Sequence, residues 1–174
     1  MKTMLFKTSS VLLLVLVYCA AALAQQGTPA KSSEVSEMQK PKYAVGFQGS
    51  FPAYGLSGKM DITDTFTGQA IIGIVGNLQT FAGRGIYNFK REPFWDAYGY
   101  GMIGAWRYSA WSNYSETVLG FGAGAGIEYD WRKFDDELPP IYWNMELGLG
   151  FANFNKVNYN FSTIMFGVGV HYRF

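Results

Sequence analysis

The last thirteen residues of the chain, residues 162–174, alternate between two kinds of side chain. Every second side chain is apolar, and the series ends on two aromatic residues: Ile164, Phe166, Val168, Val170, Tyr172 and Phe174. The positions between them are small or polar and include the only histidine, His171, and Arg173. Because successive side chains of a β-strand point to opposite faces, this spacing predicts a strand with one wholly apolar face. A water-soluble protein would have to hide that face in its interior.

The same period of two recurs from residue 43 onward. Eight segments are predicted as strands, most of them 9–12 residues long, separated by turn signals rich in Gly, Pro, Asn and Asp. They are residues 43–51, 54–62, 66–75, 78–89, 95–106, 117–131, 141–151 and 161–174. A composition with 14 Phe, 12 Tyr, 5 Trp and 21 Gly favours many short strands over a helical bundle.

Charged side chains in the strands fall on the face opposite the apolar one, which predicts an apolar exterior around a polar interior. The predicted inward charges, with the histidine, are Lys59, Asp61, Arg84, Glu128, Asp130, Glu146, His171 and Arg173. In two segments the pattern does not determine which face points inward. Residues 68–75 are apolar on both faces apart from Gln69, and residues 95–106 mix aromatic residues with glycine on both.

The N-terminus has the three parts of a secretory signal peptide. Lys2 and Lys7 supply positive charge, residues 11–18 are apolar, and residues 22–24 read Ala-Leu-Ala, a small-x-small cleavage site. Residues 1–24 are therefore predicted to be removed on export.

Charge and cysteine content narrow the class of protein. The single cysteine, Cys19, lies in the predicted signal peptide, and the bulky Tyr18 before it disfavours a lipid-modified cysteine. Without residues 1–24 the chain has 12 basic and 13 acidic residues, so it lacks the basic surplus of a nucleic-acid-binding protein. No remaining apolar run is long enough to predict a membrane-spanning helix.

Residues 25–42 are polar and contain no aromatic residue, so they cannot bury enough apolar surface to offset their ordering entropy. They are predicted to form a flexible tail, with a short capping helix as the alternative. The predicted organisation is a signal peptide (1–24), this tail (25–42) and one β domain (43–174).

The strand count suits a membrane. In lipid every backbone polar group must be paired, so only helices and closed barrels span a bilayer. The predicted fold is an all-β, eight-stranded antiparallel up-and-down transmembrane β-barrel. An even strand count puts both termini on one side, with turns at residues 63–65, 90–94 and 132–140. The short loops at the other end are residues 52–53, 76–77, 107–116 and 152–160.

In these features residues 42–174 resemble the small bacterial outer-membrane β-barrels of the OmpA/OmpX-like family. The resemblance rests on the signal peptide, the eight alternating strands, the Gly-Leu-Ser-Gly-Lys segment at residues 55–59 and the C-terminal aromatic strand. It implies an outer-membrane location with both termini periplasmic. In that family Val170, Tyr172 and Phe174 would form the signal read by the barrel-assembly machinery. It does not extend to a peptidoglycan-binding domain, so cell-wall anchoring is not implied.

The resemblance and the composition together set the expected partners. These are outer-membrane lipid, and periplasmic chaperones with the assembly machinery during biogenesis. The barrel is expected to be a monomer.

The inward charges are the candidate functional residues. Arg84 lies near the middle of residues 78–89, and Glu146 near the middle of residues 141–151. Charges inside a narrow barrel must be paired or wetted. One interpretation is a structural network, with Lys59 and Asp61 among its members. A second interpretation is a gate in which Arg84 switches between Glu146 and Glu128.

No catalytic residue, cofactor or metal site is predicted. A hydrolase would need a serine activated by histidine, and the eight-stranded lipid A deacylases carry His-x-Ser, whereas Arg173 stands two residues after His171. The inward glycines of the last three strands predict either a wall covered by bulky side chains of opposite strands or a slot for a slim apolar ligand. A serine at Gly148, facing the interior, is expected to be mild.

Three functions follow from this pattern. The first is an outer-membrane barrel with a packed polar interior and a structural, envelope-stabilising role. The second is a narrow pore or a carrier of a small apolar ligand. The third is a soluble periplasmic ligand-binding barrel.

Overall fold

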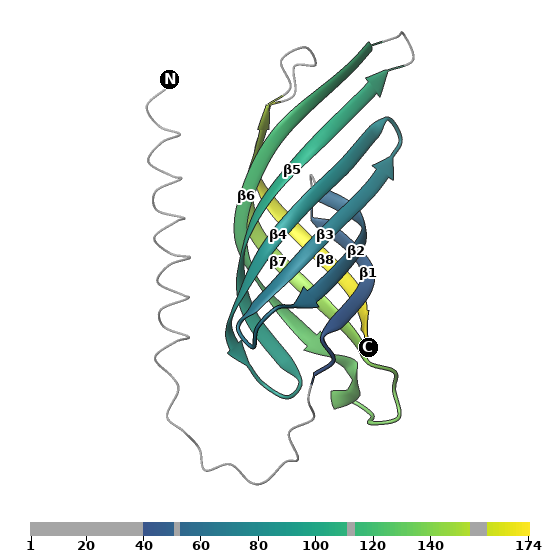
Figure 1. Cartoon of the computed structure of the whole chain (residues 1–174), viewed down its shortest axis with the longest axis vertical. Helices are drawn as coiled ribbons and strands as arrows, with labels where there is room; N and C mark the ends of the chain where they lie inside the picture. Colours follow the sequence, from purple (N-terminus) through teal and green to yellow (C-terminus); the bar gives the residue numbers. More distant parts are fainter. Residues whose placement is uncertain (1–39, 51–52, 111–113, 154–159) are drawn as a thin grey trace. The chain divides into compact units, whose positions relative to one another are not determined.

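A computed structural model describes residues 40–50, 53–110, 114–153 and 160–174, and in it eight antiparallel strands close into a barrel (Figure 1). Each strand pairs with the next, and the last pairs back with the first. The strands are β1 (Tyr43–Ser50), β2 (Ala53–Asp61), β3 (Phe66–Val75), β4 (Leu78–Arg91), β5 (Trp95–Ala110), β6 (Tyr114–Asp130), β7 (Ile141–Asn153) and β8 (Asn160–Arg173). The predicted all-β, eight-stranded up-and-down fold is confirmed. The predicted signal peptide and residues 25–39 of the predicted tail lie outside the described residues.

The strands differ in length more than the sequence predicts. β5 and β6 have 16 and 17 residues, whereas β1 and β2 have 8 and 9. The predicted loop at residues 107–116 is wrong, because pairing continues through Tyr108 with Glu116 and Ser109 with Ser115. Outward positions in this stretch are polar, so the apolar alternation stops before the strands do. Figure 1 shows β5 and β6 reaching well beyond β1 and β2.

The short turns form where the sequence predicts them. Gly76 and Asn77 connect β3 to β4, and Gly76 takes the positive φ of 56° that favours glycine. Between β2 and β3, Thr63 accepts a hydrogen bond from the backbone N–H of Phe66 at 3.0 Å. We call the end of the barrel that holds Phe174 and this Thr63 turn the terminal end, and the end that holds Gly76 the distal end.

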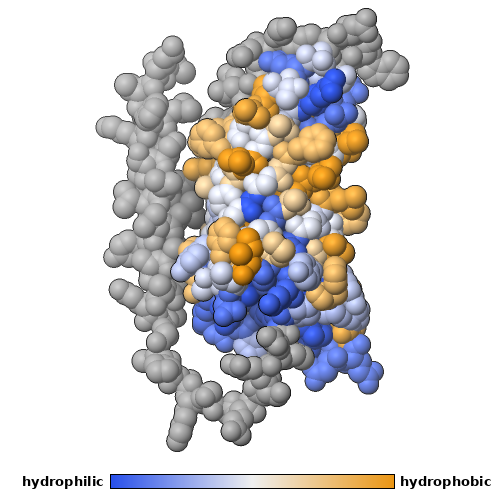
Figure 2. Space-filling view, viewed as in Figure 1, coloured by the Kyte–Doolittle hydropathy of each residue, from blue (hydrophilic) through white to orange (hydrophobic). Residues whose placement is uncertain are grey.

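The barrel is apolar outside, as predicted. Phe47 on β1 is 65% exposed and its neighbour Gln48 is 1% exposed. The inward faces of the two ambiguous segments are also defined. Gln69 and Ile71 point inward on β3, and Tyr98, Tyr100, Met102 and Trp106 point inward on β5. Figure 2 shows hydrophobic residues in a band across this face of the barrel, with hydrophilic residues above and below.

The interior has two zones, so the expectation of a polar interior holds for only part of it. Buried apolar residues form one cluster: Ala53, Ile71, Ala82, Ile86, Tyr98, Tyr100, Met102, Trp106, Val118, Ala152 and Met165. We call this set the apolar cluster. Several members belong to the distal end, since Ala53 begins β2 and Ala152 nearly ends β7. Buried polar and charged residues fill the rest of the interior.

The inward glycines are covered by side chains from neighbouring strands. On β6, the Cβ positions of Gly126, Gly124, Gly122 and Gly120 lie against Tyr98, Tyr100, Met102 and Trp106 of β5 respectively. For these four glycines the covering side chains come mainly from the adjacent strand β5, and Met165 of β8, two strands away, also covers Gly122. The prediction placed the covering side chains on opposite strands.

The same packing corrects the expected mildness of Gly148→Ser. A Cβ on Gly148 would lie 2.6 Å from the Ala123 carbonyl oxygen and 2.7 Å from the Tyr100 hydroxyl. The backbone carbonyl of a paired strand cannot move aside, so serine at this position should be disruptive.

Within the described part of the chain, no helix combines the length and apolar character needed to cross a membrane.

On the expectation that the apolar exterior faces lipid, we predict that Leu147→Arg destabilises the barrel by about 2–4 kcal/mol, because Leu147 points outward near the middle of β7. Urea unfolding of the protein inserted in lipid vesicles measures the loss. The control is Asp136→Arg in the exposed segment after β6, which should change stability by less than about 0.5 kcal/mol. Equal losses from the two variants would mean that Leu147 does not face lipid.

Candidate functional site

A buried ion pair between β4 and β7 belongs to the polar zone. The Arg84 Nη1 atom is 2.8 Å from Glu146 Oε2 and 3.1 Å from Oε1. The Tyr98 hydroxyl donates to Glu146 Oε1 at 2.8 Å, and the Ser50 hydroxyl donates to Oε2 at 2.6 Å. Both oxygens of the buried carboxylate are therefore satisfied, as a charge removed from water requires. The inward Arg84 and Glu146 predicted from the sequence are brought together.

Arg84 also contacts the apolar cluster. Its guanidinium carbon lies 4.6 Å from the centre of the Tyr100 ring, and its Nε donates to Met102 Sδ at 3.4 Å. Stacking on an aromatic face is typical of the planar guanidinium. Arg84 thus sits where the polar zone meets the apolar cluster.

A second buried network centres on Glu128. Lys59 pairs with Glu128 Oε1, and Arg173 Nη2 lies 2.7 Å from Glu128 Oε2. Arg173 also reaches Asp61 Oδ2 at 3.0 Å, and Arg91 lies 3.2 Å from the same oxygen. Lys59, Asp61 and Glu128 therefore form a group of their own and do not touch Arg84 or Glu146 through any of these bonds.

In this arrangement the switch of Arg84 that the gate hypothesis requires would break buried ion pairs. For Arg84 to switch to Glu128, the Glu128 carboxylate would have to give up Lys59, Arg173 or both. Breaking a buried pair leaves an uncompensated charge, which is strongly unfavourable.

Two further ion pairs of the described residues lie near the terminal end. Asp130, the last residue of β6, binds Arg132 at 2.6 Å and so anchors the short 3-10 helix at Trp131–Lys133. The hydrogen bonds that Arg132 donates to the Asp130 carboxylate raise the pKa of Arg132 above its ordinary value. Lys40 pairs with Asp96 of β5.

The last residues of the predicted tail are thus bonded to the barrel. Besides the Lys40 pair, the Pro41 carbonyl oxygen accepts a hydrogen bond from Arg173, and the Lys42 carbonyl accepts one from the N–H of Asp61.

Neutral polar residues link the charged groups, and sequence reasoning missed them as a site. Gln48 and Asn144 exchange two hydrogen bonds of 3.1 Å between their amides. Gln69 donates to the Ser57 hydroxyl at 2.7 Å. All four lie on the inward faces of their strands, and this inward position is the sequence signal that could have identified them. Their lack of charge kept them from standing out.

His171 lies next to a serine in the structure. The serine is Ser57 of β2, which is far from His171 in the sequence. The His171 Nε2 atom lies 2.9 Å from Ser57 Oγ, a distance at which a base could activate a nucleophile. Both residues are buried, however, and Ser57 also holds Gln69. Among the described residues no group bonds His171 Nδ1, so nothing orients the ring as an acid would in a catalytic triad. The pair joins β8 to β2 inside the barrel.

The chain has low sequence similarity to known proteins. No protein-family model matches it, and no curated protein matches it. Among solved structures it is similar to the N-terminal β-barrel domain of Pseudomonas aeruginosa OprF, with 17% identity and a TM-score of 0.48. The match covers 78% of this chain and 100% of that one. At this level the likeness carries no residue or activity across.

We predict that Arg84→Met or Glu146→Gln alone costs about 3–5 kcal/mol of unfolding free energy, since each strands a buried charge. The double variant should cost less than the sum, because it removes both charges of one pair. Denaturant unfolding in lipid of the wild type, the two single variants and the double variant completes this double-mutant cycle.

The exposed pair of Lys90 with Glu92 is the control for this cycle, and its removal should cost less than about 1 kcal/mol. Additive losses for Arg84 and Glu146 would show that the two side chains do not stabilise one another.

Proposed function

We propose that this protein is an integral β-barrel of the bacterial outer membrane with a structural, envelope-stabilising role. The observation behind the proposal is the inversion of the barrel, with large apolar side chains outside and paired charges inside. Soluble monomers rarely expose contiguous apolar surface beyond a few hundred Å². Here outward apolar residues are exposed on all eight strands, among them Val45, Leu56, Ile72, Phe81, Ile103, Leu119, Leu147 and Val168. Lipid is the solvent that suits such a surface.

Aromatic residues at the terminal end support a membrane boundary there. Outward and exposed members are Tyr43, Phe66, Tyr87, Phe89, Trp131, Tyr172 and Phe174. Lys90 lies over the Trp95 ring at 4.9 Å and Lys133 over the Tyr129 ring at 5.3 Å. Girdles of aromatic residues mark the bilayer interfaces of outer-membrane barrels. That this end faces the periplasm remains the expectation from the family resemblance.

The interior favours a structural role over transport. An ion crossing the barrel would have to separate Arg84 from Glu146 and then pass Met102, Trp106 and Met165 of the apolar cluster. Apolar constrictions exclude water and ions from narrow pores. A role in filling and stiffening the barrel needs neither step.

A narrow pore is the second candidate. It is favoured by buried polar atoms that have no bonding partner among the described residues, including Arg84 Nη2, Gln69 Oε1 and the Tyr100 hydroxyl. Buried polar groups of this kind are usually satisfied by water, and a line of water is the start of a conducting path.

An apolar-ligand carrier and a soluble ligand-binding barrel fit the structure less well. A carrier would need an open glycine wall, whereas Tyr98, Tyr100, Met102 and Trp106 cover the inward glycines of β6. A soluble barrel would need its apolar face inside, whereas the large apolar residues of the strands are exposed outside.

We predict that the protein fractionates with outer membranes and runs at a different gel position before and after heating, as a folded barrel does. The physical reason is that its exposed apolar belt is stable only in lipid or detergent. Recovery from the soluble periplasmic fraction without a heat shift would contradict the membrane proposal and support a soluble barrel.

We predict that the wild-type barrel and Arg84→Ala both leave a planar bilayer at background conductance, because the apolar cluster stays closed when the ion pair is lost. The gel shift shows whether each variant is folded, and Lys90→Ala, with an exposed side chain, is the control. A higher conductance or a changed ion selectivity in Arg84→Ala would support the pore instead.

A further inference from the structure

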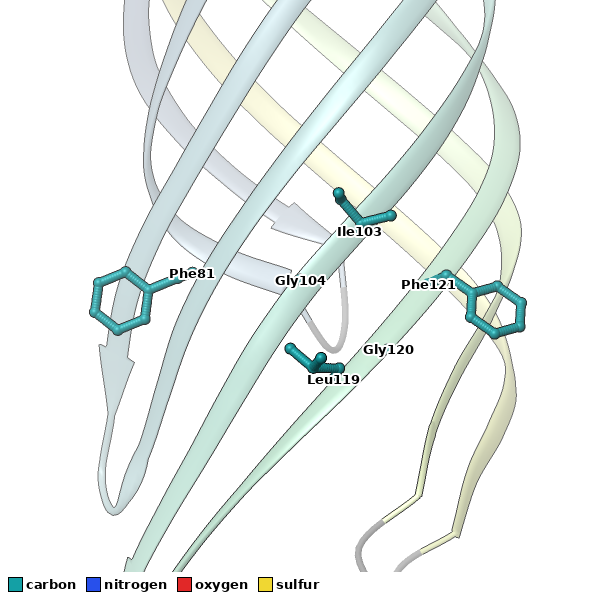
Figure 3. Close-up of a pocket in the computed structure, with 6 residues that line it drawn as sticks. All are labelled: Phe81, Ile103, Gly104, Leu119, Gly120 and Phe121. Atoms are coloured by element: carbon teal, nitrogen blue, oxygen red, sulfur yellow. The ribbon is translucent and has the colours of Figure 1, made fainter.

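An apolar groove lies on the outer surface toward the distal end, across β4, β5 and β6. Figure 3 shows Phe81, Ile103, Leu119 and Phe121 around the positions of Gly104 and Gly120. Leu119 is 81% exposed and Ile103 is 72% exposed, so both side chains stand well clear of the sheet. The groove is open to the surroundings and has a volume of about 530 Å³.

The register explains why the surface is hollow at this point. Gly104 pairs directly with Gly120, and Ala105 is flanked by Phe81 on β4 and Leu119 on β6. Neighbouring strands lie about 4.8 Å apart, so two large side chains stand about 10 Å apart over one methyl group. The result is a trough between large apolar side chains, with Gly104 and Gly120 as the small residues that line it.

A polar row borders the groove on the distal side. One step of alternation beyond Phe81, Ala105 and Leu119, the paired outward residues are Gln79, Arg107 and Thr117. Cβ atoms of directly opposite residues in a sheet are about 5 Å apart, so the three polar side chains can reach one ligand.

Arg107 is the cation of this row. Its side chain is exposed and has no hydrogen bond or ion pair with any residue that the structure describes. The acidic residue next in sequence to Thr117, Glu116, lies on the opposite face of the sheet, paired with the inward Tyr108. No carboxylate of these three strands therefore competes for the guanidinium on the outward face.

We propose that this surface binds a membrane lipid whose headgroup carries a phosphate. The phosphate binds the Arg107 guanidinium, with the Gln79 amide and the Thr117 hydroxyl as further donors, while an acyl chain lies in the groove below. A guanidinium matches phosphate geometry and binds it with two parallel hydrogen bonds. The distance of one alternation step, about 7 Å, places headgroup and chain as they are joined in a lipid. The inference rests on the proposed function, because it needs the outward face to contact lipid.

The test is native mass spectrometry of the barrel purified from membranes into a neutral detergent. The probe is dipalmitoyl phosphatidic acid, and the matched lipid is dipalmitoylglycerol, which has the same chains and no phosphate. The barrel should retain phosphatidic acid in preference to the diacylglycerol. Inorganic phosphate alone should not bind at the same concentration, since it lacks the chains.

Variants assign the binding to the two halves of the surface. Arg107→Gln should weaken phosphatidic acid binding about tenfold, the effect of losing a charge-assisted hydrogen bond, whereas Lys133→Gln at the terminal end should leave it unchanged. Leu119→Ala should weaken binding several-fold, and the equally outward Leu56→Ala on β2 should not.

Equal retention of phosphatidic acid and diacylglycerol, or wild-type binding by Arg107→Gln, would overturn the inference. Equal binding of inorganic phosphate would also overturn it, because the groove would then contribute nothing. The heat shift of the same samples separates this failure from that of the proposed function. A barrel that shifts but shows no phosphate preference refutes only the lipid site.

Discussion

Backbone pairing between β8 and β1 is the interaction on which the rest of the structure depends. Seven residue pairs run from Ala44 with Arg173 to Ser50 with Gly167, and Tyr43 and Phe174 exchange backbone hydrogen bonds beyond them. Gly46 allows this approach, since a Cβ at that position would overlap the Val170 carbonyl oxygen. The closed ladder leaves neither strand with a free edge, which is the condition for a sheet to exist in lipid. It also gives the terminal aromatic strand a structural role beside any role as an assembly signal.

Closure determines what the interior must contain. Eight strands leave room for little besides side chains, so most inward polar groups find a partner from another strand. The Arg84–Glu146 pair, the Glu128 network and the exchanged amides of Gln48 and Asn144 meet this requirement. Tyr98 and Tyr100 fill the space over the glycines of β6 and also join the two zones, because Tyr98 binds Glu146 and Tyr100 stacks on Arg84. The interior is therefore one packed unit.

The sequence was sufficient for the strands and most of their faces, because alternation is a local property. It was also sufficient to place Arg84 and Glu146 inside. The sequence could not show that Arg84 and Glu146 form an ion pair with each other, or that Glu128 pairs with Lys59 and Arg173 instead. That choice depends on strand tilt and stagger around the barrel, which relate residues far apart in sequence.

The same dependence on residues far apart in sequence explains two wrong predictions. The extension of β5 and β6 was missed because outward residues there are polar while inward Trp106 and Tyr108 still pack against the apolar cluster. The tolerance expected for Gly148 failed because a Cβ there would meet the backbone carbonyl of Ala123 on β6 and the Tyr100 hydroxyl of β5, two strands away.

The most direct test of a lipid-facing barrel is nitroxide accessibility along β6 in reconstituted vesicles. The sole cysteine, Cys19, lies in the predicted signal peptide, so single cysteines can be introduced at outward Ala123, Ala125 and Ile127 and at the exposed Asp136. We expect spin labels at the three strand positions to collide readily with oxygen, which concentrates in lipid, and rarely with a water-soluble nickel reagent. Asp136 should show the reverse. High nickel accessibility at all three strand positions would mean that this surface faces water, and the protein would not be a membrane barrel.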